Sequence, residues 1–109
     1  MITATYDRRS HRLRVRGHAG SGRKGQDLVC AAVSALVLTA AGNIASLAAQ
    51  GGVLSQRLRL EDGDADIACV PKSRMAPLAT VMLDTVALGL QLLETSYPDH
   101  LRLTVLGDQ

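Results

Sequence analysis

Residues 17–36 read GHAGSGRKGQDLVCAAVSAL, and this stretch decides how the rest of the chain is interpreted. It joins the end of an alternating, strand-like segment to a long alanine-rich segment with helical spacing. His18 precedes the glycine-rich part, and Cys30 follows it in the first turn of the expected helix. A thiol and an imidazole on opposite sides of a short loop are the minimum parts for nucleophilic catalysis by cysteine. We therefore treat the other segments as the scaffold that brings these two side chains together.

Outward from this stretch, the hydrophobic pattern predicts five strands and two helices. The expected strands cover residues 1–6, 11–17, 53–60, 65–70 and 101–105, and the expected helices cover residues 28–50 and 74–94. The order ββαββαβ predicts an α/β fold, a two-layer sandwich with one sheet and one helical layer. At 109 residues the chain is expected to form one domain, residues 1–109, without an internal repeat.

Each expected helix has an apolar face that we assign to the core. For the first helix the core positions are Val29, Val33, Leu36, Ala40, Ile44 and Leu47. For the second helix they are Leu78, Val81, Met82, Thr85, Leu88 and Leu92, with Asp84 and Gln91 on the wetter side. The chain has no Trp and no Phe, so the predicted core is aliphatic.

Charge is distributed unevenly along the chain, although the net charge is only +2. Seven of the twelve basic residues precede Gly25, and Asp7 is the one acidic residue among them. In the strand over residues 11–17, Arg12, Arg14 and Arg16 share one face and Leu13 and Val15 the other. The arginine face suits either an anionic partner or simple exposure to solvent, and we favour solvent exposure.

The composition also bears on the compartment and on membranes. Two cysteines, Cys30 and Cys69, are too few for a disulfide framework, which favours a reducing, cytoplasmic setting. The first sixteen residues alternate and are charged, unlike a signal peptide. Residues 28–49 are nearly uncharged, but their apolarity is mostly alanine diluted by polar residues, which favours a buried globular helix over a membrane span.

Cys30 is the candidate nucleophile. Asp27 is a credible N-cap, which places Cys30 at the third helical position, where backbone N–H groups and the helix dipole favour a thiolate. We therefore expect a lowered pKa for the thiol, and the N–H groups at the helix start, including that of Cys30, as an oxyanion hole. The alternative is that Cys30 is a small buried hydrophobic residue, as most free cysteines are.

Other residues around Cys30 have two interpretations each. His18 is either the general base or a surface histidine like His11 and His100. Asp27 is either a cap alone, which we favour, or a cap that also orients His18. Ser34 either hydrogen-bonds near the thiol or bonds back to the carbonyl of Cys30.

Three glycines, Gly20, Gly22 and Gly25, are expected to let the loop close over a substrate. The loop superficially suggests a phosphate site, but Lys24 precedes Gly25 and the order GxxxxGK[ST] is absent. Cys69, between Ala68 and Val70 on a strand, is expected in the core. The scattered His and Cys residues lack metal-ligand spacing, so we expect neither a metal nor a cofactor.

The residues Gly17-His18-Ala19, the glycine loop and the run from Gly25 to Leu36 closely resemble the ribosomal-processing cysteine protease Prp family. The resemblance is most specific in the Asp-(hydrophobic)-Val-Cys-Ala-Ala-Val-Ser run, and it covers the chain in length and element order. It implies a cysteine endopeptidase with His18 and Cys30 as the catalytic dyad, and a loop between them that orders over substrate.

The same resemblance implies a substrate and an assembly. The family removes a short N-terminal extension from the twenty-seventh protein of the bacterial large ribosomal subunit, and its substrates present an aromatic residue at the cleavage site. It also implies a homodimer and a thioester acyl-enzyme.

One rival hypothesis is a non-enzymatic ribosome- or RNA-associated module that uses Arg12, Arg14 and Arg16. It predicts binding that weakens steeply with salt. The chain has no aromatic residues interleaved with these arginines, which argues against base stacking and makes direct nucleic-acid binding the weaker hypothesis. The hypothesis of a thiol redox protein is weaker still, because Cys30 lacks a nearby resolving cysteine.

Overall fold

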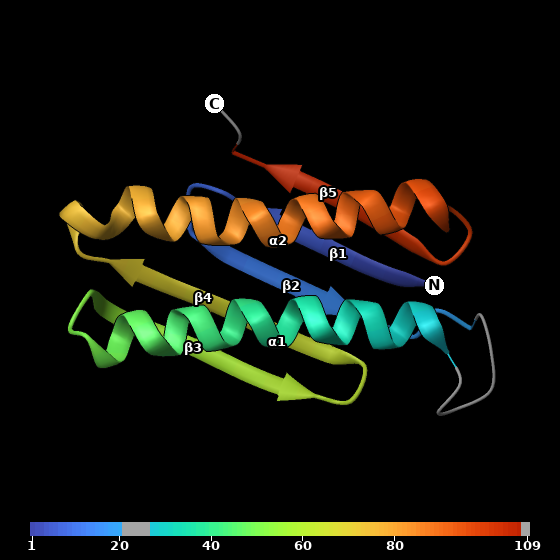
Figure 1. The fold of residues 1–109 in the computed structure, drawn as a ribbon, viewed down its shortest axis with the longest axis horizontal. Helices are drawn as coiled ribbons and strands as arrows, with labels where there is room; N and C mark the ends of the chain where they lie inside the picture. The colour runs from blue at the N-terminus through green and yellow to red at the C-terminus, as the bar shows by residue number, and fades with distance from the viewer. Residues whose placement is uncertain (21–26, 108–109) are drawn as a thin grey trace.

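The computed structural model describes residues 1–20 and 27–107 and confirms the predicted order ββαββαβ. Figure 1 shows one sheet with both helices across the same face, which is the expected two-layer sandwich. The element bounds lie close to those expected from the sequence. They are β1 Ile2–Asp7, β2 Arg12–Arg16, α1 Leu28–Ala49, β3 Val53–Glu61, β4 Asp64–Pro71, α2 Ala76–Ser96 and β5 Leu101–Leu106, with a short 3-10 turn over Ser73–Met75.

The five strands pair in the order β3-β4-β2-β1-β5. All neighbours are antiparallel except β1 and β5, which run parallel. Because β2 and β4 are antiparallel, with Arg16 opposite Asp64, the end of β2 lies beside the turn that joins β3 to β4. The start of β1 lies at the same end of β2, with Thr3 opposite Arg16. This pairing determines where the residues after β2 are placed.

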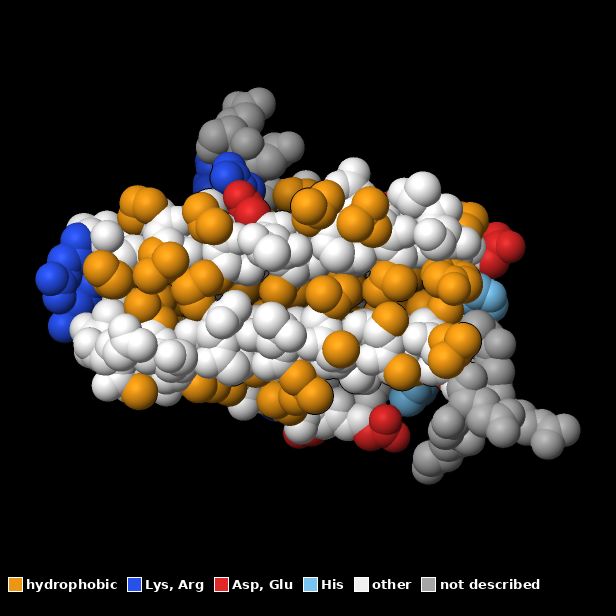
Figure 2. All heavy atoms as spheres, in the orientation of Figure 1, with side chains coloured by type: hydrophobic (Ala, Val, Ile, Leu, Met, Phe, Trp, Pro, Cys, Tyr) orange, Lys and Arg blue, Asp and Glu red, His pale blue; other side chains and the backbone are white. Residues whose placement is uncertain are grey.

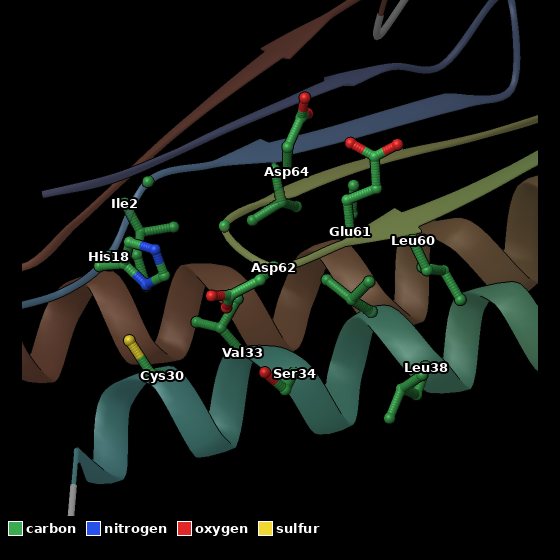
Figure 3. A pocket seen from close by; sticks show the side chains of 15 residues that line it. Ile2, His18, Cys30, Val33, Ser34, Leu38, Leu60, Glu61, Asp62 and Asp64 are labelled. Atoms are coloured by element: carbon green, nitrogen blue, oxygen red, sulfur yellow. The ribbon is translucent and has the colours of Figure 1, made fainter. Parts of the chain in front are cut away.

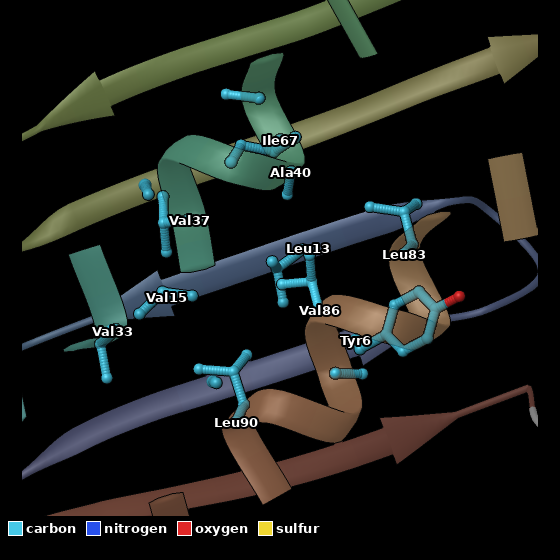
Figure 4. Packing of buried hydrophobic residues seen from close by; sticks show 14 of the residues in the cluster. Tyr6, Leu13, Val15, Val33, Val37, Ala40, Ile67, Leu83, Val86 and Leu90 are labelled. Atoms are coloured by element: carbon cyan, nitrogen blue, oxygen red, sulfur yellow. The ribbon is translucent and has the colours of Figure 1, made fainter. Parts of the chain in front are cut away.

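The core lies between the sheet and the helical layer and is aliphatic, apart from Tyr6 and Cys69. Figure 4 shows side chains of α1 and α2 packed over Tyr6, Leu13 and Val15 of the sheet. In α1 the prediction is confirmed with one adjustment, since Leu36 is only partly buried and Val37 is buried. The buried residues of α1 are Val29, Val33, Val37, Ala40, Ala41, Ile44 and Leu47.

The predicted core face of α2 is wrong. Its buried residues are Ala79, Leu83, Val86, Ala87 and Leu90. Most of the predicted positions are exposed instead, and Met82 is only partly buried. The exposed ones are Leu78, Val81, Thr85, Leu88 and Leu92.

The reason for this error is the environment of Asp84, which we had assigned to the wet side. Its carboxylate accepts hydrogen bonds from the Tyr6 hydroxyl at 2.7 Å and from Arg8 at 2.8 and 2.9 Å. The Arg8 guanidinium, followed by the Tyr6 hydroxyl, holds the pKa of Asp84 below its usual value. With these partners a half-buried carboxylate can lie against the sheet, and the apolar residues opposite it turn outward.

The face of the sheet away from the helices carries the predicted arginine row. Asp66, on β4, lies in the centre of this row and is only 2% exposed. It accepts two hydrogen bonds from Arg12, at 2.9 and 2.7 Å, and one from Arg57 at 3.4 Å, with Arg14 at 3.9 Å. The arginine row of β2 is therefore paired with acidic residues that are distant in sequence, because Arg16 in turn lies 3.6 Å from Asp64.

Both helices are long and apolar enough to cross a membrane by length and composition alone. In this fold each packs one side on the sheet through its buried residues, as a core helix of a globular domain does. The structure thus agrees with the interpretation of residues 28–49 as a globular helix.

We expect Asp66→Asn to lower the free energy of unfolding by about 2 kcal/mol, because it removes charge-assisted hydrogen bonds to arginines that then face one another. The matched change Asp64→Asn, at a one-third exposed side chain, should cost less than about 1 kcal/mol. Urea unfolding near neutral pH measures both.

The pH dependence provides a second check on Asp66. The guanidinium of Arg12 lowers the pKa of Asp66, so its contribution is fully present above the ordinary carboxyl pKa and is lost as pH falls through the lowered value. Equal losses for the two variants at neutral pH would contradict a central role for Asp66.

Candidate active site

His18 lies just beyond the end of β2, at a point where several chain segments meet. Gly17 donates its N–H to the carbonyl of Gly63 in the β3–β4 turn at 2.9 Å. The carbonyl of His18 accepts a hydrogen bond from the amino group of Met1 at 2.7 Å. The backbone on either side of the imidazole is therefore held by the β3–β4 turn and by the residue that precedes β1.

The β3–β4 turn also contacts the imidazole itself. Gly63 has φ +69°, a left-handed conformation that favours glycine. A Cβ at this position would lie 2.6 Å from Nε2 of His18, so the ring packs directly on the glycine backbone. In the sequence, residues 61–64 join the strands expected over residues 53–60 and 65–70. The Asp-Gly pair in that turn was a signal for the hairpin, but nothing in it indicated contact with His18.

Cys30 lies in the first turn of α1, as predicted. Asp27 is the N-cap, and its carboxylate accepts a hydrogen bond from the N–H of Cys30 at 3.0 Å. This confirms Asp27 as a cap. It also corrects the expectation that the N–H of Cys30 contributes to an oxyanion hole, because the cap already uses that donor.

His18 and Cys30 line one cleft, of about 320 Å³, between the start of α1 and the β3–β4 turn. Figure 3 shows the sulfur of Cys30 and the imidazole of His18 directed toward the same space. The walls are mostly apolar and include Val15, Val33 and Val37. The acidic side chains around the cleft come from the β3–β4 turn and the strand ends beside it: Glu61, Asp62 and Asp64.

The electrostatics of the thiol differ from the sequence-based expectation. Burial raises the pKa of the Cys30 thiol, and the carboxylate of Asp27 raises it further, while a hydrogen bond from the N–H of Ala19 opposes the rise. The predicted lowering of this pKa is therefore wrong. The cap that places Cys30 at the helix start also puts a negative charge beside it, which disfavours a thiolate.

The N–H of Ala19 points at the sulfur of Cys30, with a distance of 3.3 Å between the two atoms. The carbonyl of the same residue contacts Nδ1 of His100 at 2.9 Å. His100 precedes β5, whose parallel pairing with β1 brings it to this end of the sheet. His100 is thus more than a surface histidine, because it holds the carbonyl side of Ala19. The peptide group whose N–H faces the thiol is the one before it, and the amino group of Met1 holds that group through the carbonyl of His18. The long separation in sequence explains why sequence analysis missed the role of His100.

The remaining predicted site residues have fewer contacts with His18 and Cys30, or lie away from them. Ser34 lines the cleft and is exposed, and its hydroxyl makes neither predicted hydrogen bond to the described residues. Gly20 is exposed with φ +68°, whereas Gly22 and Gly25 lie outside the described residues. Cys69 is buried in the core, as expected. Within the described residues no group of three or more His, Cys, Asp or Glu side chains is arranged to hold a metal ion.

Comparison with known proteins gives consistent results over nearly the whole chain. Residues 1–102 match the sequence profile of the family described as Cysteine protease Prp. The Ribosomal processing cysteine protease Prp of Bacillus subtilis (strain 168) is 34% identical over 112 aligned residues, which cover 95% of this chain and 96% of that protein.

Two crystal structures of the essential ribosomal processing protease Prp from S. aureus share the fold. The structure with a covalently linked product peptide is 27% identical with a TM-score of 0.76. The structure with a substrate peptide is 26% identical with a TM-score of 0.69. Each alignment covers 96% of this chain and 99% of the other.

The electrostatics of this site predict that Asp27→Asn lowers the pKa of Cys30, because it removes the negative charge but retains a good N-cap. The rate of iodoacetamide labelling of Cys30 against pH, followed by mass spectrometry, measures this pKa. Asp27→Ala should lower it too, and should also lower the free energy of unfolding by about 1 kcal/mol through the lost cap. A labelling profile that stays in place or moves to higher pH in Asp27→Asn would contradict the assignment.

Proposed function

The chain belongs to the cysteine protease Prp family, and we propose that it removes the N-terminal extension of the twenty-seventh protein of the bacterial large ribosomal subunit. Members of this family are cysteine proteases, so the reaction class is peptide hydrolysis. The proposal depends on one observation, that the thiol of Cys30 and the imidazole of His18 face each other across a single cleft.

In the proposed reaction the thiol is protonated at rest, since its pKa is raised. His18 takes the proton as the sulfur attacks the scissile carbonyl, and later gives it to the leaving amine. A thioester acyl-enzyme forms, and water hydrolyses it with His18 as the base. The N–H of Ala19, 3.3 Å from the sulfur, stabilises negative charge that develops there.

The cleft suits the kind of substrate that we propose. Its apolar walls, which include Val15, Val33 and Val37, can accept a large apolar side chain beside the scissile bond. The B. subtilis relative is described as acting in ribosomal processing, and the S. aureus relative has been crystallised with a substrate peptide. These descriptions favour a peptide segment of a ribosomal protein over a small molecule.

We also propose that the protein is a homodimer that uses the outer face of the helical layer. Figure 2 shows hydrophobic side chains along this face. α1 contains no charged residue, and the two in α2, Asp84 and Glu94, hydrogen-bond to the sheet. The exposed apolar side chains of α2 are Leu78, Val81, Leu88 and Leu92. An uncharged, apolar helical face of this length is typical of an interface between subunits.

A cytoplasmic location is part of the proposal, because Cys30 and Cys69 are both free and ribosomal proteins are assembled in that compartment. The rival hypothesis, an RNA-binding module, is not favoured. Arg12 and Arg14, on which it depends, face the carboxylate of Asp66 within the same domain.

The purified protein should cleave the organism's own N-terminally extended ribosomal protein at a single position, which sequencing of the new N-terminus identifies. Cys30→Ala should abolish cleavage, and Cys30→Ser should reduce it at least about 1000-fold, because a hydroxyl is a far weaker nucleophile than a thiol without stronger activation. His18→Ala should cost about 100- to 10,000-fold.

Cys69→Ala serves as the matched control, because it removes the second thiol away from the cleft and should leave the cleavage rate close to that of the wild type. Undiminished cleavage by the Cys30 variants would exclude the thiol mechanism. Full activity in His18→Ala would exclude His18 as the general base and would leave Cys30 as the proposed nucleophile.

The dimer proposal predicts that Leu88→Lys produces a monomer, because it buries an unpaired charge at the centre of the α2 face. Sedimentation velocity measures the association state, and circular dichroism checks that the fold is retained. Val70→Lys is the control, since Val70 is equally an exposed apolar residue, 52% exposed compared with 54% for Leu88, but lies on β4. A wild-type protein that sediments as a monomer would exclude the dimer.

A further inference from the structure

We propose that Asp62 forms a subsite for a cationic side chain, Lys or Arg, within one or two residues of the scissile bond. This inference rests on the proposed function, because it concerns the peptide that occupies the same cleft. It makes Asp62 a residue that determines specificity and leaves the catalytic roles to Cys30 and His18.

The first observation concerns the charges around the cleft. Among the described residues that line it, the titratable side chains other than His18 and the Cys30 thiol are three carboxylates, Glu61, Asp62 and Asp64. Two of them are already paired with Arg59, which lies 2.9 Å from Asp64 and 3.3 Å from Glu61. Arg16 adds a further contact to Asp64 at 3.6 Å. Their charge is therefore compensated before any substrate binds.

Asp62 differs from the other two in direction and in pairing. Figure 3 shows the side chains of Glu61 and Asp64 directed away from Cys30, whereas the carboxylate of Asp62 is directed into the cleft above Val33. No side chain of the described residues forms an ion pair or hydrogen bond with Asp62. Within the part of the chain that the structure describes, Asp62 is thus a carboxylate without a paired cation, at the edge of a mostly apolar cleft.

The surroundings of Asp62 strengthen its preference for a cation. The lining of the cleft around Asp62 is mostly apolar and includes Val33, Leu38 and Leu60, and an occupying peptide would exclude water from this region. In a less polar medium, a carboxylate attracts an opposite charge more strongly and repels a like charge more strongly. The methylene groups of a Lys or Arg side chain can pack on the apolar wall while the charged end reaches the carboxylate.

The position of the subsite follows from the helix. Val33 is three residues after Cys30, a rise of about 4.5 Å along α1. An extended peptide advances about 3.3 Å per residue. A peptide whose scissile carbonyl lies at Cys30 therefore places a side chain near Asp62 one or two residues away.

The test uses fluorogenic peptides that span the junction of the extended ribosomal protein, with Lys, Gln or Glu placed in turn at the two positions on either side of the scissile bond. At one of these positions the wild type should prefer Lys over Gln by about fivefold in kcat/KM, which is the size of a partly exposed ion pair, and should disfavour Glu. The preference should diminish as salt is raised.

Asp62→Asn should remove this preference and leave the rate on the Gln peptide within about twofold of the wild type. Asp62→Lys should reverse it, so that the Glu peptide becomes the better substrate. Glu61→Gln is the matched control, because its carboxylate is directed away from the cleft, and the Lys-to-Gln ratio should stay unchanged. Affinity of the Cys30→Ala variant for the same peptides provides a readout that does not require turnover.

Three results would overturn the inference. Equal rates on all peptides would exclude the subsite while leaving the protease function intact. An equal loss on the Lys and Gln peptides in Asp62→Asn would mean that Asp62 acts on His18 instead of on the substrate. Cleavage of no peptide at all, with no binding to Cys30→Ala, would overturn the proposed function itself.

Discussion

The antiparallel pairing of β2 with β4 is the interaction on which the site depends. It places the end of β2 against the β3–β4 turn, where the N–H of Gly17 donates to the carbonyl of Gly63 at 2.9 Å. A glycine at φ +69° is required there, because any side chain would collide with the imidazole of His18. The same pairing brings Asp62 to the mouth of the cleft. One strand register thus positions the imidazole of His18, packs Gly63 against it and places the carboxylate of Asp62 beside the cleft.

Three aspartates have different structural roles in this domain. Asp66 lies buried among arginines on the outer face of the sheet and holds the cationic strands together. Asp84 joins the helical layer to the sheet through Tyr6 and Arg8. Asp27 caps α1, and its charge helps to keep the nearby thiol protonated. The cap therefore stabilises the helix start and disfavours a preformed thiolate, which is consistent with the general-base role that we propose for His18.

Local patterns predicted much of this structure. The five strands, two helices and their order follow from alternation and helical spacing, and the N-cap follows from Asp27 three residues before Cys30. The core face of α2 could not be predicted, because the helix is apolar on both sides and the polar marker Asp84 is satisfied by residues of β1 and the turn that follows it. The pKa of Cys30 was mispredicted for a related reason. The backbone N–H groups and the helix dipole that lower a thiol pKa can be inferred from neighbouring residues. The burial that raises the pKa of Cys30 depends on the whole fold.

By itself, the sequence determined the element order, the family and the pair of residues that we propose as catalytic. The element order follows from local hydrophobic periodicity along the chain, and the family and the proposed pair follow from short-range spacing around residues 17–36. Only the tertiary structure decided what surrounds that pair. His100 reaches Ala19 through the parallel pairing of β5 with β1. The pairing of β4 with β2 brings Gly63 against His18 and Asp62 to the cleft beside it. These contacts join residues far apart in the chain. They are set by strand register and sheet order, which depend on the packing of the whole domain.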